Sequence, residues 1–360
     1  MLPPPRLLRL VTSAPGTRAL SAARPGIVPG ALLAALFVFP AAPAVAEPAA
    51  QPATKQAALP DPEELRLETS DGLDLVVQYF AAPGEEKPEA TVILVHDLGG
   101  SSKTVDPLAE TLQAAGCAVL VPDLRGHGES SIPAYAKQAA KGEQWKLLKL
   151  PDFKAMAVTA GGRVRGQSDI RGDLETVRTW IKQQADEGVL DMDRLVVVGS
   201  GLGAAVAATW TVADSAWPPS ARGPQGGHVR GLVLVDPAFT TKGFVMSPML
   251  AAEPVKSGLP IMILAGGGSR DAGKIFDQLK RARPSGWFDS RLYDAETRKN
   301  KSPAKDSEAS LLYLQVDARD RQGAPLGGDE LASLRSTDPQ RRAPAAFIAA
   351  FVKAKAAQPR

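Results

Sequence analysis

Short apolar runs alternate with amphipathic stretches between residues 61 and 354 of this chain. Five of the runs are almost continuously apolar, as expected for strands that are buried on both faces of a sheet. They are residues 91–95, 117–121, 195–198, 232–235 and 261–264. After the first run, Val105, Leu108 and Leu112 recur at helical spacing, and Gly116 ends the predicted helix.

The remaining periodic segments complete a regular alternation of strands and helices. Residues 65–69 and 73–80 flank Asp71-Gly72 and are predicted to form an antiparallel hairpin. A helical stripe, Ile170, Leu174, Val177 and Ile181, ends near Gly188. Residues 311–316 are the predicted last strand, and residues 343–354 a closing helix. This order predicts the α/β class, with a mostly parallel central sheet covered by helices on both faces.

The first 46 residues have the pattern of a secretory signal peptide. Four arginines and no acid precede an apolar run at 27–39, and Ala44-Val45-Ala46 precedes Glu47. An uncleaved anchor is the alternative, but Pro29 and Pro40 bracket only about 10 residues of the ~20 that a bilayer needs. We therefore predict cleavage after Ala46, export to the periplasm or the medium, and no stable membrane insertion afterwards.

The rest of the chain is predicted to be one domain, residues 61–356, behind an Ala/Pro-rich linker at 47–60. Residues 131–167 interrupt the alternation and could form a cap insertion. Without the leader, 38 basic residues face 39 acidic ones, a net charge of −1, which argues against nucleic acid as a partner. Cys117 is the only cysteine, so no intramolecular disulfide can form.

Three segments, in this order, resemble the α/β-hydrolase superfamily of serine hydrolases and lysophospholipases. Residues 92–100, Val-Ile-Leu-Val-His-Asp-Leu-Gly-Gly, resemble the strand and His-Gly turn that supplies one oxyanion-hole amide. Residues 123–130, Asp-Leu-Arg-Gly-His-Gly-Glu-Ser, resemble the superfamily's Asp-x-Arg-Gly-x-Gly-x-Ser loop. Residues 195–203 lie where the nucleophile elbow is expected. The resemblance implies the α/β-hydrolase fold.

The elbow departs from the superfamily pattern Gly-x-Ser-x-Gly. When Gly199 and Gly203 are aligned with the flanking glycines, Gly201 takes the place of the nucleophile. If Ser200 were the nucleophile instead, Val198 and Leu202 would crowd the turn with side chains. We therefore expect the nucleophile to be missing.

The base that activates a serine also lacks a candidate. The histidines of the chain are His96, His127 and His228. The first two occupy turns where the superfamily has structural histidines, and His228 is expected in an exposed Gly-rich loop. The base normally follows the last strand, where residues 311–328 offer only Asp317 and Asp320. Asp271 resembles the superfamily's catalytic acid, or is simply a helix cap.

These observations favour a catalytically inactive hydrolase fold that binds an unknown small molecule or protein, without a cofactor. Its relic pocket would comprise Leu98, Ser200, Gly201, Leu202 and Asp271, and the amides of Leu98 and Leu202 could hold a small oxyanion or carboxylate. The alternative is an active serine-type hydrolase of an ester, amide or lipid with an unorthodox site.

Two nucleotide-binding motifs match the sequence less well than the α/β-hydrolase motifs do. Residues 199–204 fit a dinucleotide-binding motif, with Asp236 as the ribose ligand, but Asp236 lies too far along the chain. Residues 268–274 fit a phosphate loop, except that Ile275 replaces the hydroxyl that would bind magnesium. No cluster of metal ligands is evident, and no metal is expected.

Overall fold

The computed structural model describes residues 59–157, 172–217, 226–294, 296–297, 299–335 and 343–358. They belong to one compact unit, Lys55–Arg360. The predicted signal peptide and most of the predicted linker lie outside the described residues. No helix in the described part of the chain is both long and apolar enough to cross a membrane.

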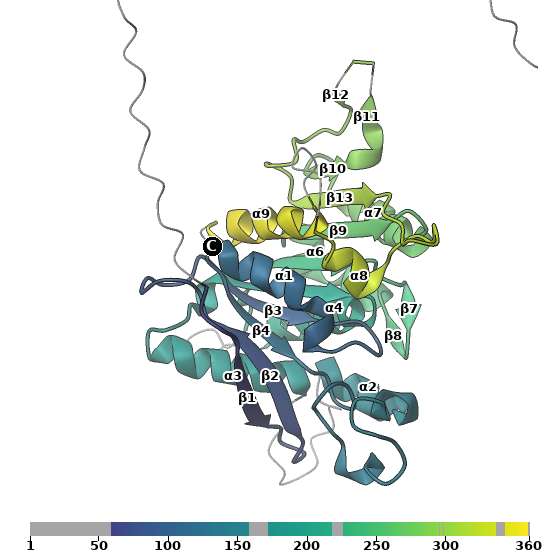
Figure 1. The fold of residues 1–360 in the computed structure, drawn as a ribbon. Coiled ribbons are helices and arrows are strands. Elements are labelled where there is room, and N and C mark those ends of the chain that lie inside the picture. The colour runs from purple at the N-terminus through teal and green to yellow at the C-terminus, as the bar shows by residue number, and fades with distance from the viewer. Residues whose placement is uncertain are drawn as a thin grey trace, which may run out of the picture. The chain divides into compact units, whose positions relative to one another are not determined.

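Nine strands of the described chain form one central sheet (Figure 1). Their order across the sheet is β1 (Glu63–Glu68), β2 (Asp74–Phe80), β4 (Ala118–Pro122), β3 (Thr91–Val95), β5 (Leu195–Ser200), β6 (Val229–Val235), β9 (Ile261–Gly266), β13 (Leu311–Val316) and β10 (Trp287–Asp289). β2 runs antiparallel to both of its neighbours, and every other pair is parallel. The predicted mostly parallel sheet is confirmed.

Helices cover both faces of this sheet, as predicted. One face packs against α1 (Ser102–Ala114), α8 (Gly328–Ala332) and α9 (Pro344–Ala356). The other face packs against α2 (Leu150–Ala157), α3 (Asp173–Asp186), α4 (Leu202–Ser215), α5 (Ser247–Ala251), α6 (Glu253–Ser257) and α7 (Arg270–Ala282). Within β3, Ile93 and Val95 belong to one core, while Val92 and Leu94 belong to the other. This alternation explains why the strand reads as a continuous apolar run.

The segment between α7 and β13 was not predicted. It contains β10, the short helix η4 (Ser290–Leu292) and the two-stranded sheet of β11 (Tyr293–Asp294) and β12 (Lys299–Asn300). β13 is the last strand along the chain, as predicted, and β10 pairs in parallel outside it at the edge of the sheet. Strands of two or three residues carry too few positions to show a hydrophobic period.

The described part of the predicted cap, residues 131–157, contains η1 (Pro133–Tyr135), η2 (Gln144–Leu147) and α2. The Trp145 amide donates to the Gly126 carbonyl at 2.8 Å, and the indole lies so close to Gly99 that a Cβ there would be 3.1 Å away. The segment therefore packs against two of the loops that carry the superfamily resemblance. Residues 158–167 of the predicted cap lie outside the described chain.

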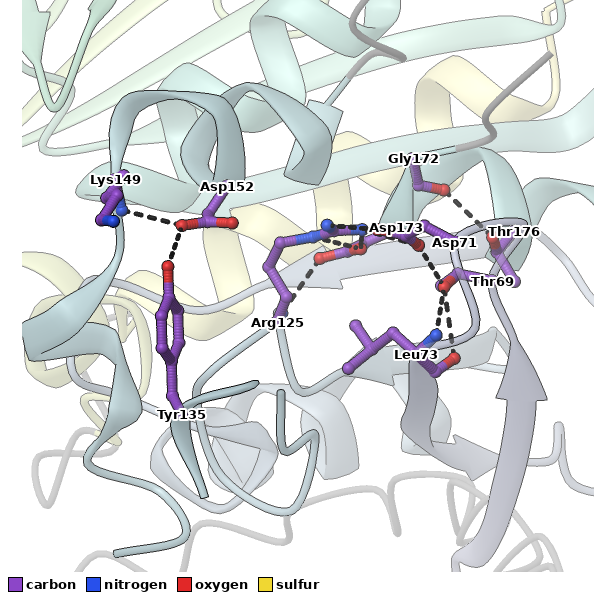
Figure 2. Close-up of polar contacts among 10 residues, drawn as sticks. All are labelled: Thr69, Asp71, Leu73, Arg125, Tyr135, Lys149, Asp152, Gly172, Asp173 and Thr176. Carbon is purple, nitrogen blue, oxygen red and sulfur yellow. Dashed lines mark hydrogen bonds and ion pairs between the residues drawn. The ribbon is translucent and has the colours of Figure 1, made fainter. Parts of the chain in front are cut away.

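A buried ion pair joins the loop after β4 to two other elements (Figure 2). Arg125 donates through Nε and Nη2 to Asp173 Oδ1 in α3, at 2.9 and 2.7 Å. Its Nη1 donates to Asp71 Oδ2 in the turn between β1 and β2, at 2.9 Å. Three short elements complete the described structure: η3 (Met192–Arg194) before β5, and the hairpin of β7 (Thr240–Thr241) and β8 (Phe244–Val245).

Candidate functional site

The turn between β5 and α4 has the form of a nucleophile elbow with Gly201 at its tip. β5 ends at Ser200, α4 begins at Leu202, and Gly201 between them has φ 51° and ψ −114°. The Gly201 amide donates to the Val235 carbonyl at 2.9 Å. A backbone in this region is strained for any residue that has a side chain. The structure places Gly201 at the tip of this turn, as the sequence predicts.

Close backbone packing explains the glycines on either side of the turn. A Cβ on Gly199 would lie 2.3 Å from the Gly203 carbonyl oxygen. A Cβ on Gly203 would lie 2.4 Å from the carbonyl oxygens of Val95 and His96. These contacts favour the alignment through Gly199 and Gly203 over the one that makes Ser200 the nucleophile.

The Asp97 carboxylate fills the space beside Gly201. A Cβ on Gly201 would lie 2.0 Å from Asp97 Cγ, so the carboxylate takes the volume that a nucleophile's side chain would need. The Leu98 and Leu202 amides both donate to Asp97 Oδ1, at 2.6 and 2.7 Å. The place that the sequence assigns to a small oxyanion or carboxylate is thus occupied by the chain's own carboxylate.

Asp97 is held in an electrostatically unfavourable setting. Burial raises its pKa, and the negative charge of Asp329 raises it further, while the amides of Leu202 and Leu98 oppose the rise. Asp329, in α8, accepts from the Asp97 amide at 2.8 Å and from the Thr104 hydroxyl at 2.5 Å. Two carboxylates therefore share one small network at the elbow.

Ser200 belongs to the same network but not to the surface. Its side chain is only 1% exposed, and its hydroxyl donates to Asp329 Oδ1. A serine held in this way has an acidic neighbour but no imidazole, and no route to a substrate at the tip of the turn. The structure brings Leu98, Gly201 and Leu202 together around Asp97, and Ser200 joins them through Asp329.

His96 and His127 both lie in the interior and are hydrogen-bonded to backbone groups. His96 is fully buried, accepts from the Leu124 amide at Nε2, and donates from Nδ1 to the Asp97 carbonyl at 2.7 Å. His127 lies 3.1 Å from the Arg125 carbonyl through Nδ1 and stacks on Trp145. Burial, followed by the neighbouring His96, lowers the pKa of His127 to about 3, so this ring is neutral at physiological pH.

His228 lies at the amino end of β6 and is partly buried rather than exposed. Its amide donates to Asp214 Oδ2 at 2.8 Å, and this contact with the end of α4 accounts for the burial. The elbow lies at the carboxyl ends of the parallel strands. His228 therefore lies at the opposite end of the sheet from the elbow.

Asp271 lies apart from the elbow network. It is the second residue of α7 and accepts from the Phe239 amide and from Lys274 Nζ, both at 3.1 Å. The Phe239 hydrogen bond, then the Lys274 contact, lowers its pKa. Asp271 lines a separate cavity of about 500 Å³ whose walls include none of the four elbow residues. The predicted relic pocket is therefore divided between two places.

The sequence matches the profile of the family described as serine aminopeptidase, S33, over residues 86–266, half of the chain. The chain belongs to the serine aminopeptidase S33 family. This assignment places it in the α/β-hydrolase superfamily, as its motifs predict. No curated protein matches the chain.

Solved structures similar to this S33 family member have low sequence identity. An esterase from Pyrococcus furiosus is 16% identical over 72% of this chain and 83% of its own, with a TM-score of 0.42. An esterase from Rhizomucor miehei is 15% identical over 84% and 86%, with a TM-score of 0.46. A dienelactone hydrolase from Anabaena variabilis is 13% identical over 82% and 96%, with a TM-score of 0.42. These likenesses add nothing on activity to the family match.

Two residues that dominate the elbow of this family member, Asp97 and Asp329, were not predicted. Asp97 had a signal in the sequence, because it follows His96 where the superfamily's turn has glycine. Asp329 lies one residue beyond residues 311–328, where the superfamily's base is expected. Asp317 and Asp320, inside that region, bond within their own loop, to Arg319 and to the amides of Gln322 and Ala324.

The elbow does not suit a nucleotide. The negative charge of Asp97 fills the turn where a pyrophosphate would have to lie, and the glycines there are explained by packing. Within the described ranges, no three His, Cys, Asp or Glu side chains group closely enough to hold a metal ion.

Proposed function

We propose that this S33 family member is a catalytically silent hydrolase fold that binds a small molecule or a protein without cleaving it. One observation carries the proposal: the Asp97 carboxylate fills the nucleophile's space and accepts from both oxyanion-hole amides. A serine hydrolase needs a nucleophile, a base and free oxyanion donors at one point. At this elbow the nucleophile is replaced by Gly201, and both donors are engaged.

The histidines support the same proposal. Both imidazoles of the elbow region are buried and hydrogen-bonded to backbone groups, so neither is poised as a base. The members of a triad act as a unit, and losing any of them leaves only ~10³–10⁴-fold acceleration over water. With the oxyanion amides also occupied, even that remainder should be reduced.

Membership in a family of serine hydrolases, taken alone, favours the alternative, an active hydrolase of an ester, amide or lipid. One contact in the structure provides a nucleophile and a base for this alternative. The Ser200 hydroxyl donates to Asp329, and in this alternative Asp329 is its base. The burial of Ser200 argues against it, because a substrate carbonyl would have to reach a side chain that is 1% exposed.

Esterase turnover and covalent labelling distinguish the two functions. We expect the purified protein to show no p-nitrophenyl ester hydrolysis beyond that of Ser200→Ala, and no labelling by a fluorophosphonate probe. Gly201→Ser should also be inactive, because the base is still missing and Asp97 blocks the new side chain. Robust turnover of the wild type that Ser200→Ala abolishes would establish the active alternative.

We also propose that the chain is exported and cleaved after Ala46. The basic acid-free leader, the short apolar run and Ala44-Val45-Ala46 support this proposal, and the near-neutral remainder argues against a nucleic-acid partner. We expect N-terminal sequencing or intact mass of exported protein to place Glu47 first. Retention of residues 1–46 would instead indicate an anchor.

A further inference from the structure

A second site is offered by the cavity of about 500 Å³ at the carboxyl ends of β6 and β9. Pro237, Ala238, Pro325 and Leu326 form its apolar walls. Two glycines allow the lining segments to approach one another. A Cβ on Gly266 would lie 2.2 Å from the Leu326 carbonyl oxygen, and a Cβ on Gly327 would lie 2.4 Å from Asp236 Oδ2. The volume lies within the range of small-molecule sites, which combine apolar walls with a few convergent polar groups.

Asp236 supplies a free negative charge to this cavity. Its backbone amide donates to the Leu264 carbonyl at 2.7 Å, but its carboxylate has no hydrogen bond or ion pair with any described residue. The residue has φ 48°, a left-handed conformation that is uncommon outside glycine. Such strained positions cluster at ligand sites, where the surrounding structure holds them in place.

Arg270 supplies the opposite charge. It is the first residue of α7, it is exposed, and its guanidinium pairs with no carboxylate of the described chain. The partial positive charge of the helix N-terminus adds to that of Arg270 on the same wall. Asp271, on the same wall, pairs with Lys274 at 3.1 Å and not with Arg270.

The cavity therefore carries one free carboxylate and one free guanidinium that do not pair with each other. We propose that it binds a small zwitterion with an apolar side chain, such as a free amino acid. The ligand's ammonium group lies on Asp236, its carboxylate on Arg270, and its side chain against the proline and leucine walls. The inference rests on the proposed function in one respect. If Asp97 occupies the elbow of a catalytically silent protein, the ligand binds at another site.

Isothermal titration calorimetry of the full chain with three matched probes tests the charge requirement. L-leucine carries both charges, 3-methylbutylamine lacks the carboxylate, and 4-methylpentanoate lacks the ammonium group. We expect binding of L-leucine, and binding at least about tenfold weaker for each single-charge probe, the effect of losing one charge-assisted contact. No heat with L-leucine at about 10 mM, or equal binding of either single-charge probe, would overturn the proposal.

Three variants locate the site. Asp236→Asn keeps the shape and tolerates the left-handed backbone, and Arg270→Gln changes an exposed side chain, so both should fold. Each should weaken L-leucine binding about tenfold or more, whereas Arg281→Gln, an exposed arginine in the last turn of the same helix, should not. Unchanged affinity in both cavity variants would place L-leucine elsewhere and refute the assignment.

The outcome is independent of the hydrolysis assay. Absence of L-leucine binding would leave the silent elbow untouched, because esterase turnover measures Gly201, Ser200 and Asp97. Ester hydrolysis abolished by Ser200→Ala would refute the silent elbow whatever the calorimetry shows.

Discussion

Asp97 provides the hydrogen-bond acceptor for the two backbone amides of the elbow. The Leu98 and Leu202 amides converge on one point, and buried N–H groups without an acceptor cost about 1–3 kcal/mol each. Asp97 Oδ1 accepts from both, so the turn is satisfied without a substrate. This arrangement destabilises the charged form of Asp97. Burial raises the pKa of its carboxyl group, and the nearby Asp329 carboxylate raises it further.

Replacing Asp97 with asparagine should reveal this destabilisation in the free energy of unfolding. The pKa of Asp97 is raised in the folded state, so its ionisation destabilises the fold as pH rises through that pKa. Asp97→Asn keeps an oxygen for the two amides and removes the charge, and should stabilise the protein by about 1 kcal/mol at pH 7. The gain should vanish below about pH 4, where aspartate is protonated in both states.

Denaturant unfolding at several pH values measures this difference, with Asp271→Asn as the control of opposite sign. The pKa of Asp271 is lowered, mainly by the Phe239 amide, so its ionised form favours the fold above the unfolded pKa. Asp271→Asn should therefore be neutral or destabilising at pH 7. A destabilised Asp97→Asn at pH 7 would show that the amide bonds require the full charge.

At the scale of elements, the elbow depends on how closely α4 approaches β3 and β5. Gly203 lies against the backbone carbonyls at the end of β3, and Gly199 against the first turn of α4. Neither contact is with a flexible side-chain end, so neither can give way cheaply. The geometry of the turn is thus set by backbone packing, whether or not a nucleophile is present.

The same substitution in two helices should have opposite effects. Gly203→Ala in α4 places a Cβ 2.4 Å from two carbonyl oxygens and should cost on the order of 2 kcal/mol or more through overpacking. Gly273→Ala in α7 meets nothing nearer than 3.4 Å and should stabilise the chain by about 0.5–1 kcal/mol, since alanine favours helix. Thermal unfolding of both variants compares them. A tolerated Gly203→Ala would mean that α4 can shift away from β3.

At the scale of the whole domain, Arg125 joins segments that are distant in sequence. Its guanidinium reaches Asp173 in α3 and Asp71 in the β1–β2 turn, while its amide donates to Asp173 Oδ2 at 2.9 Å (Figure 2). Asp173 is fully buried, and burial raises its pKa although Arg125 opposes the rise. Arg125 therefore supplies the main interaction that offsets the burial of the charged carboxylate.

Removal of this guanidinium should therefore be costly. Arg125→Met leaves Asp173 buried without its counter-charge, and loss of one partner of a buried pair typically costs about 3–5 kcal/mol. Arg66→Met is the matched control, because Arg66 is half exposed and pairs with Glu64 and Asp74 at the surface. Its loss should cost no more than about 1 kcal/mol in the same urea titration. Equal effects of the two variants would contradict a special role for the buried pair.

The sequence by itself determined the sheet apart from its edge strand β10, the two helical layers and the glycine at the tip of the elbow. Each of these is encoded locally. Strands that are buried on both faces must be apolar throughout, and the strained turn at Gly201 is flanked by glycines because the backbone packs too closely there for a side chain. The absence of a histidine after residue 228 could also be read directly.

Only the tertiary structure decided what fills the site. Ser200 and Asp329 are 129 residues apart, and their hydrogen bond depends on how α8 packs beside the end of β5. Asp97 accepts from the Leu202 amide, 105 residues away, and Asp271 lines a separate cavity rather than the elbow. Hydrophobic periodicity carries no information on such contacts, because they depend on side-chain directions at the ends of elements that are distant in sequence.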